Sequence, residues 1–577
     1  MPYIGIDLGT TFSAMAYLDR DGKPVTIPNA EGDLTTPSVV LFESETEVIV
    51  GREARRASLA EPDRVAEDVK RYMGDDFYPR VLLGQRLSPI TLSAMILRKL
   101  MQDARARAGS IDGAVITVPA YFDEFRRQAT AAAAELAGLR LLDIINEPTA
   151  AALAYAYRGF VADGTVARGQ PRTVLVYDLG GGTFDVTLLR TVGGDLTVLA
   201  TAGDVRLGGR DWDERLFNHL ADLFVREHGD DPRDDPLSRQ QLMSLAEEAK
   251  KDLSRRTHTP YVVNHAGKSL RGQITRAEFD QLTADLLFRS ESRVSRVLRD
   301  AGLAWDAVDE LLAVGGSTRM PQVQEMLQRI SGKTPNTSVS PDEAVAHGAA
   351  IHAAIAVAAH GGEAPAAPAA TPPAGGEGPP PAEPSAGQEG DALSQLAAAT
   401  TTIQRPAADP APAIDAAEEK KFLAWLGDKL VRLLRSVHTT NVNAHSLGVV
   451  AEDRAGRRFV RHLIARNSRL PAAASRCFAT VTTNQRRVTV EIVEGESEAV
   501  DYCLAVGTCV ITQLPAGLPR GSPIEVTFRY DRSGRLHVQA VHLASGAWAE
   551  TLIQRGGGVD PQKIHLSREL LQRVSVT

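Results

Sequence analysis

The 577-residue sequence has only three cysteines, Cys477, Cys503 and Cys509, and their spacing matches no zinc-binding pattern. It has no run of eighteen apolar residues, so no transmembrane segment is predicted. The net charge is −8, which argues against a nucleic-acid partner because phosphate binding needs a basic surface. The first residues lack the basic start and apolar stretch of a secretory signal. We therefore expect a cytoplasmic protein.

The sequence also lacks the GxxxxGK[ST] pattern, which excludes a P-loop nucleotide site. Up to residue 357 it contains short β-branched runs that alternate with alanine- and leucine-rich stretches. Strands that alternate with helices are typical of an α/β architecture. We predict one large α/β unit over residues 1–357.

The composition changes over residues 358–414. Eleven of the 32 prolines lie between residues 361 and 412, with much alanine and glycine, so this segment is predicted to be a disordered linker. Residues 415–437 have apolar side chains at helical spacing, and Asp415 with Glu418 resembles a capping box. We predict one amphipathic helix, which either packs on its own domain or faces a partner or a membrane. Alternating strands then fill residues 438–557, and residues 558–577 form a short tail with room for one small helix.

Two segments of the α/β unit are near copies of each other. "DLGTT" starts at Asp7 and "DLGGGT" starts at Asp178, and each follows a predicted strand. A glycine turn leaves backbone N–H groups free for a phosphate, and a carboxylate beside it suits Mg²⁺. Each copy alone could be an ordinary hairpin turn. As a pair, they predict two related lobes that close on one polyphosphate.

A third glycine pair, Gly315-Gly316 in "AVGGSTRMPQVQEML", ends a predicted strand and offers a flat backbone surface to a nucleoside. These three segments resemble the phosphate-one, phosphate-two and adenosine motifs of the superfamily of actin, sugar kinases and heat-shock ATPases. More narrowly, "GIDLGTTFS", "AVITVPAYF", "IINEPTAAALAY", "DLGGGTFDV" and "VGGSTRMPQVQ" resemble the heat shock protein 70 chaperone family in order and spacing. The resemblance covers residues 3–357. It implies an α/β actin-like ATPase of two lobes, followed by an all-β sandwich that binds peptides.

The resemblance also implies roles for individual residues. The catalytic residues would be Lys70, Glu147, Asp178, Thr183 and Asp185, and Asp7 and Asp178 would hold Mg²⁺ through water. K⁺ is a further candidate ion. The contacts to ATP or ADP would come from Asp7, Gly9, Thr10, Thr11, Gly180, Gly181, Gly182, Thr183, Gly208, Gly209, Glu247, Lys250, Gly315, Gly316, Ser317, Arg319 and Asp342. Pro119 and Arg127 match the pair that relays the nucleotide state to the second domain.

The β-rich part resembles the family's peptide-binding sandwich. Five residues match positions that line its apolar slot, namely Val449, Phe478, Val481, Val488 and Val490. The alternative is that they are ordinary core residues. The leading function is an ATP-dependent chaperone in which slow hydrolysis is coupled to the binding of extended apolar peptides. The alternative is an ATP-gated scaffold whose helix recruits a partner. A small-molecule kinase is disfavoured by the motif set.

Several residues depart from the family pattern. The interdomain linker at 437–442, "VHTTNV", is polar where the family has leucines, so we expect weaker docking on the ATPase. Glu452 takes the place of an apolar residue over the peptide, and Arg255 replaces a serine beside adenine. Asp143 stands where a basic residue meets a J-domain co-chaperone, so that docking would be repelled, whereas a nucleotide exchange factor remains an expected partner. Without a long helical lid after residue 557, bound peptide should leave fast.

Overall fold

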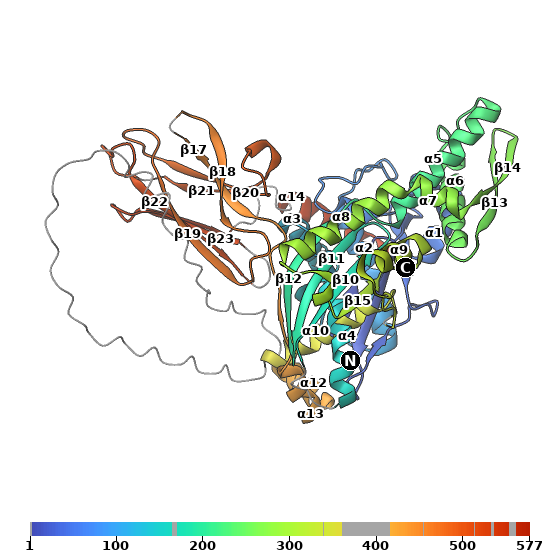
Figure 1. Cartoon of the computed structure of the whole chain (residues 1–577), viewed down its shortest axis with the longest axis horizontal. Coiled ribbons are helices and arrows are strands. Elements are labelled where there is room, and N and C mark those ends of the chain that lie inside the picture. Colours follow the sequence, from blue (N-terminus) through green and yellow to red (C-terminus); the bar gives the residue numbers. More distant parts are fainter. Residues whose placement is uncertain are drawn as a thin grey trace.

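The computed structural model describes residues 3–163, 170–338, 340–360, 416–453, 455–512, 514–531, 536–552 and 561–577. Its α/β part and its β-sandwich lie side by side, and the helices α12 and α13 lie at the edge of the α/β part (Figure 1). Most of the predicted linker, from residue 361 to 414, lies outside the described residues, as does Asp415 of the predicted capping box.

The first lobe is built on a mixed sheet with the order β3-β2-β1-β8-β9, and β4 pairs with β2. Its strands are β1 (Tyr3–Asp7), β2 (Phe12–Leu18), β3 (Pro24–Thr26), β4 (Thr36–Pro37), β8 (Gly113–Val118) and β9 (Leu141–Asn146). A smaller sheet contains β5 (Val40–Phe42), β6 (Glu47–Val50) and β7 (Val65–Ala66). The helices of this lobe are α1 (Arg52–Ala57), α2 (Pro89–Ala108) and α3 (Glu124–Leu136).

The second lobe repeats the plan with the order β15-β10-β11-β12-β16. Its strands are β10 (Arg172–Leu179), β11 (Phe184–Val192), β12 (Asp195–Asp204), β15 (Glu310–Val314) and β16 (His438–Thr440), with the hairpin β13 (His258–His265) and β14 (Lys268–Thr275) beside them. Its helices are α5 (Gly209–His228), α6 (Pro236–Leu253), α7 (Arg276–Leu282), α8 (Ala284–Asp300) and α9 (Pro321–Ser331). Between the lobes, α4 (Glu147–Asp163) packs on β10 while α10 (Ala344–His360) packs on β1.

The predicted repeat is visible in the register of the two sheets. In the first lobe, β1 runs antiparallel to β2 and Asp7 pairs with Ala14. In the second, β10 runs antiparallel to β11 and Asp178 pairs with Asp185. Each of these strands also has a parallel neighbour, β8 or β15. Both aspartates therefore leave their sheets at equivalent points and face the same space between the lobes.

The predicted single helix at 415–437 is two helices in the structure, α12 (Ala416–Leu426) and α13 (Asp428–Arg435). Gly427 separates them with a φ of 79°, a backbone conformation that favours glycine. The apolar residues Phe422, Leu426, Val431 and Leu434 are buried in the core between α4 and α10. The helices thus pack on their own domain, which was the first of the alternatives for this segment. The partner-facing and membrane-facing alternatives are not favoured, because these residues of the apolar face are buried in that core.

Residues 438–440 of the polar linker contact the ATPase, and the expected weaker docking stays a prediction. Residues 438–440 form β16, which runs parallel to β12 and pairs with it at three positions. These residues therefore belong to the second lobe rather than to the sandwich. Strand pairing uses backbone N–H and C=O groups, so it does not require leucine side chains. The flanking Val437 and Val442 are 2% and 5% exposed and supply the apolar contact.

The sandwich consists of two four-stranded antiparallel sheets, β18-β17-β20-β21 and β19-β22-β23-β24. The strands are β17 (Leu447–Glu452), β18 (Arg458–Ile464), β19 (Ala472–Ala479), β20 (Val488–Glu494), β21 (Leu504–Ile511), β22 (Pro523–Tyr530), β23 (Leu536–His542) and β24 (Trp548–Leu552). Alternate residues of each strand face the shared core, as β-periodicity requires.

The C-terminal tail packs on the first lobe. It contains α14 (Pro561–Arg573), which contacts α2 and α3, and β25 (Ser575–Val576), which pairs in parallel with β6. Leu571, Val574 and Val576 are buried in the core of the first lobe. The sequence predicted room for one small helix here. It did not predict the added strand, because the pairing joins residues more than 500 positions apart.

Candidate nucleotide site and its connection to the sandwich

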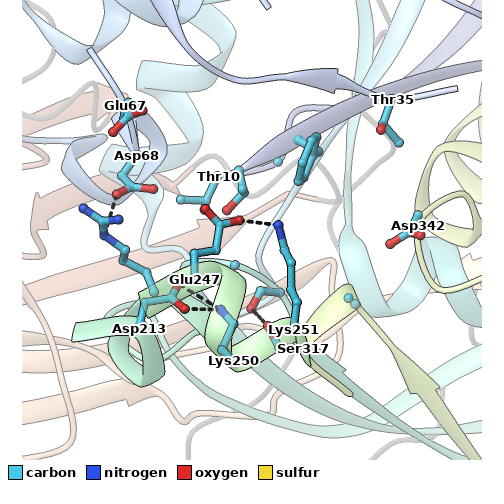
Figure 2. A pocket seen from close by; sticks show the side chains of 18 of the residues that line it. Thr10, Thr35, Glu67, Asp68, Asp213, Glu247, Lys250, Lys251, Ser317 and Asp342 are labelled. Atoms are coloured by element: carbon cyan, nitrogen blue, oxygen red, sulfur yellow. Dashed lines mark hydrogen bonds and ion pairs between the residues drawn. The ribbon is translucent and has the colours of Figure 1, made fainter. Parts of the chain in front are cut away.

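A cavity of about 930 Å³ lies between the two lobes. Residues of all three glycine segments line it, together with residues of α6 and of the turn at Val69–Tyr72. Figure 2 labels several residues of the cavity, among them Thr10, Glu247 and Ser317. The predicted site residues that line it are Asp7, Gly9, Thr10, Thr11, Lys70, Glu147, Asp178, Gly180, Gly181, Thr183, Glu247, Lys250, Gly315, Gly316, Ser317, Arg319 and Asp342. The sequence therefore located the cavity from segments that are far apart in the chain.

The two phosphate loops pack face to face. A Cβ on Gly181 would lie 1.9 Å from Oγ1 of Thr11, and a Cβ on Gly182 would lie 2.4 Å from Cγ2 of Thr10. Glycine is therefore required at both positions for the lobes to approach each other. Thr10 is 6% exposed and lies at the wall of the cavity. Gly182 lies behind that wall and is not among the residues that line the cavity.

Four carboxylates lie near Lys70. Asp7, Glu147 and Asp178 line the cavity, whereas Asp185 is 1% exposed and is not among the residues that line it. Lys70 is 6% exposed and its ammonium pairs with Glu147. Burial and the charge of Glu147 raise the pKa of Asp7 to about 7, against the opposing effects of Lys70 and of a hydrogen bond from Thr117. Asp185 has its pKa raised to about 8 by burial and by Glu147.

The pKa of Asp178 is raised, as are those of Asp7 and Asp185. Burial raises its pKa well above the usual range, and the charges of Glu147, Asp185 and Asp7 add to the effect. Burial is the main cause of these raised pKa values and repulsion between the carboxylates adds to it, so a cation placed among them would favour their charged forms. The donor set of oxygen ligands is the one that Mg²⁺ prefers.

A metal ion bound only by side chains, without water ligands, does not fit this cluster best, however. In the part of the chain that the structure describes, no three His, Cys, Asp or Glu side chains converge closely enough to hold one. Mg²⁺ usually keeps several water molecules and binds through one or two carboxylates and the phosphates of a substrate. The arrangement therefore fits a hydrated Mg²⁺ beside Asp7 and Asp178. The roles of both residues, and K⁺ binding, stay predictions.

The predicted nucleoside side of the cavity contains paired charges. Lys250 lies 2.7 Å from Asp213 and donates to the carbonyl of Gly209 at 2.9 Å. Burial raises the pKa of Asp213, while Lys250 opposes this. In Figure 2 the ammonium of Lys250 points to Asp213, and Asp342 lies on the other side of the view. Asp342 pairs with Arg319 at 2.8 Å, and Arg255 also lines the cavity.

Gly208 and Gly209 are placed behind the cavity rather than on its surface. A Cβ on Gly208 would lie 2.5 Å from the backbone of Gly182, and a Cβ on Gly209 would lie 2.4 Å from Oγ of Ser317. Their position lets the start of α5 pack against the second phosphate loop. Ser317 donates to the carbonyl of Gly180 at 2.9 Å and ties the adenosine segment to the same loop.

Sequence reasoning missed the ion pairs that join the two lobes, among them one beside the cavity. Arg55, on α1 of the first lobe, lies 2.5 Å from Glu247 on α6 of the second lobe. Burial would raise the pKa of Glu247, but Arg55 and Lys251 together outweigh it and lower the pKa to about 2. The acid itself was predicted, but its partner was not, because nothing local to "GREARRA" indicates which face of α1 meets the other lobe.

The predicted relay residues lie beside the acid cluster. Asp185 accepts hydrogen bonds from the backbone N–H groups of Ala120 and Tyr121, both at 3.1 Å. Pro119, which is buried, precedes these two residues. Arg127 donates to the side chain of Asn146, which directly precedes Glu147. Both predicted residues are thus joined to catalytic-site segments.

The same segment reaches the sandwich. The ring of Tyr121 lies 4.3 Å from the ring of His445, which lies just before β17. A second contact is an ion pair between Arg466 and Asp300 at 2.5 Å. A third is a hydrogen bond at 3.1 Å from the backbone N–H of Thr201 to the side chain of Asn467. The ATPase and the sandwich are therefore in direct contact.

The predicted co-chaperone position is occupied by a local pair. Asp143 lies 2.8 Å from Nε2 of His352 on α10 and also accepts from the N–H of Ile144. Its side chain is 36% exposed. The expected repulsion of an acidic co-chaperone motif stays a prediction.

The five predicted peptide contacts are in different environments. Val449 and Val490 are 2% and 7% exposed and belong to the sandwich core. Phe478 and Val488 are half-buried against that core, and Val481 is 41% exposed. Glu452 is exposed at the end of β17. Peptide binding by these residues stays a prediction.

Comparison with known proteins agrees with this geometry. A family model described as "Hsp70 protein" matches residues 3–82, 80–363 and 432–571. "Chaperone protein DnaK" of Thermotoga neapolitana is 38% identical over 552 residues, which cover 94% of this chain and 78% of that protein. "Chaperone protein DnaK" of Thermotoga maritima has the same identity and coverage. Among the described residues, no helix has the length and apolar character needed to cross a membrane. The chain therefore belongs to the Hsp70 family and is an ATP-dependent chaperone, with an actin-like ATPase followed by a β-sandwich.

Proposed function

We propose that the protein hydrolyses ATP slowly and uses the nucleotide state to control how its sandwich holds extended apolar segments of unfolded proteins. One observation carries the coupling. Asp185, in the acid cluster, holds the backbone of Ala120 and Tyr121, and the ring of Tyr121 contacts His445 next to the sandwich. A change in charge at Asp185 would therefore act on the segment that touches the second domain.

The proposed chemistry follows from the groups at the cavity floor. Bound Mg²⁺ would supply positive charge to the phosphate oxygens. Lys70, now paired with Glu147, offers a compact ammonium that stabilises negative charge on the transferred phosphoryl group. Glu147 and Asp185 would orient an attacking water, and Thr10 and Thr183 would contact phosphates. The family match, rather than the shape of the cavity, favours hydrolysis over small-molecule kinase activity.

We also propose a division of the chain that differs from the sequence boundaries. Residues 3–360, α12, α13 and β16 would act as the ATPase unit, and β17 to β24 as the peptide-binding unit. The support is the burial of α12 and α13 in the ATPase core and the pairing of β16 with β12. The scaffold alternative, in which residues 415–437 recruit a partner, is not favoured because the same burial removes the recruiting face. A J-domain co-chaperone and a nucleotide exchange factor remain candidate partners.

The test of the enzyme site is Lys70→Ala, compared with Lys23→Ala as a matched control. Lys23 is exposed in the first lobe, away from the cavity. Loss of the ammonium should lower the Mg²⁺-dependent rate of ATP hydrolysis by about a hundredfold or more, because electrostatic stabilisation of the transition state is lost. The control should keep the wild-type rate. Equal rates for Lys70→Ala and wild type would overturn the assignment of the site.

A further inference from the structure

Two arginines face the inside of the sandwich beside the predicted peptide residues. Val449 on β17 pairs across the sheet with Arg461 on β18 and with Ile492 on β20. Side chains at directly paired positions project from the same face of a sheet. Val449 and Ile492 are core residues, so Arg461 starts from the inner face of its strand. Its guanidinium lies 5.3 Å from the ring centroid of Phe459, two residues earlier on that face.

The second arginine comes from the facing sheet. On β19, Arg476 stands between Ala474 and Phe478 in the alternating pattern, and both of these pack in the sandwich core. Its cross-strand partner is Val526, which is 1% exposed. Arg476 is therefore also on an inner face. It adjoins Phe478, one of the residues predicted to bind peptide.

Both arginines lie on the side of the sandwich where the edge strands β18 and β19 meet. β18 and β19 are edge strands of their respective sheets, and they contact each other. Burial lowers the pKa of Arg476, and the positive charge of Arg461 lowers it further, which indicates that the two guanidinium groups influence each other. Two like charges in a partly buried place favour a negatively charged group between them.

The loop before β20 adds positive charge on this side, whereas Glu452, at the end of β17, is an exposed acid. Residues 475–488 contain three arginines and no acidic residue, in a chain whose net charge is −8. On the loop between β17 and β18, the carboxylate of Asp453 is paired with Arg457 at 2.9 Å, and on the adjoining sheet Glu491 of β20 is paired with Arg458 of β18 at 2.5 Å. Arg486 and Arg487, on the other loop, are exposed. A carboxylate on the bound segment would complement this surface.

We infer that Arg461 and Arg476 are specificity-determining residues, which make the sandwich select extended apolar segments that carry an acidic side chain. This inference rests on the proposed peptide-binding function. The apolar residues contact the flanking side chains of the bound segment. The guanidinium groups donate charge-assisted hydrogen bonds to its carboxylate. An arginine in this position also disfavours segments with lysine at the same place.

The test uses three fluorescent peptides that share one apolar sequence and differ at a single central position, which is Glu, Gln or Lys. Affinities are measured by anisotropy with the full-length protein in ADP. We expect the Glu peptide to bind on the order of tenfold more tightly than the Gln peptide, and the Lys peptide more weakly than either. The preference should shrink at high salt, because screening weakens partly exposed charge pairs.

The variants Arg461→Gln and Arg476→Gln should each reduce the Glu preference while leaving the Gln peptide's affinity close to wild type. Arg529→Gln is the matched control, since Arg529 is exposed on the outer face of β22 and should keep the full preference. Equal affinities for all three peptides would overturn this inference and leave the proposed function standing. Failure of every peptide to bind would overturn both.

Discussion

The helix pair α12 and α13 should act as an anchor for the linker, and Phe422 is its central contact. Phe422 is 4% exposed and its ring meets that of Tyr3 edge-on, with centroids 4.9 Å apart. It also stacks on Trp425 at 6.0 Å. Two residues separate the end of α13 from β16, and β16 pairs with β12 at only three positions. The linker strand should therefore depend on the anchor for its position.

Truncation by Phe422→Ala removes a buried ring and leaves a cavity between α12 and the first strand. Such a substitution in a well-packed core lowers the free energy of unfolding by about 3–5 kcal/mol. The loss of an aromatic pair contributes about 0.5–1.5 kcal/mol to such a loss. Because α12 and α13 are short and add little stability of their own, that loss should release them locally rather than unfold the lobes. We expect the linker strand to be released with them.

Hydrogen exchange resolved by mass spectrometry measures this directly. In Phe422→Ala, amides of residues 416–440 should exchange on the order of a hundredfold faster or more, while β1 and β10 keep their protection. The matched control is Phe288→Ala on α8, where the ring is 68% exposed and its loss should change nothing in this segment. Unchanged protection of residues 416–440 in Phe422→Ala would refute the reasoning.

Two further predictions concern ion pairs. Arg55 and Lys251 lower the pKa of Glu247 to about 2, against the effect of burial. Because this value lies below the ordinary pKa of 4.5, the charged carboxylate stabilises the folded state fully above pH 4.5. The stabilisation is lost as the pH falls toward 2. Urea unfolding of Glu247→Gln from pH 6 to pH 3 should lack this part of the pH dependence, which amounts to about 2 kcal/mol over that range, and an unchanged pH profile would contradict it. Arg466→Ala should weaken docking of the sandwich by about 1–2 kcal/mol, because Asp300 loses a partner that is 12% exposed. Energy transfer between dyes on the two domains should report a more open average, and an unchanged distance would count against the docking contact.

The parts of the fold that follow from local chemistry could be predicted. The repeated Asp-Leu-Gly segments indicated two lobes because a glycine turn after a strand, with an acid beside it, is a local requirement of phosphate binding. The structure places both segments at one cavity, with Gly181 and Gly182 at the contact between the loops. The site roles of individual residues were carried over from the family pattern and stay predictions.

The parts that depend on distant contacts could not be predicted. The parallel pairing of β25 with β6 and the ion pair between Arg55 and Glu247 have no local signature. The strand pairing of the polar linker was not predicted because the prediction weighed side chains, whereas β16 is held by its backbone. The break in the amphipathic helix did have a signal, Gly427, but the regular apolar spacing on both sides of it hid the interruption.

The central claim is that the nucleotide site controls the sandwich through the segment that contains Tyr121. The most direct measurement is the affinity of a fluorescent apolar peptide in ATP and in ADP, for wild type and Tyr121→Ala, with Tyr502→Ala as the control at a residue that is 82% exposed. The account predicts binding about 5- to 150-fold tighter in ADP for wild type and the control, and a smaller difference for Tyr121→Ala. Equal affinities in ATP and ADP for the wild-type protein would contradict it.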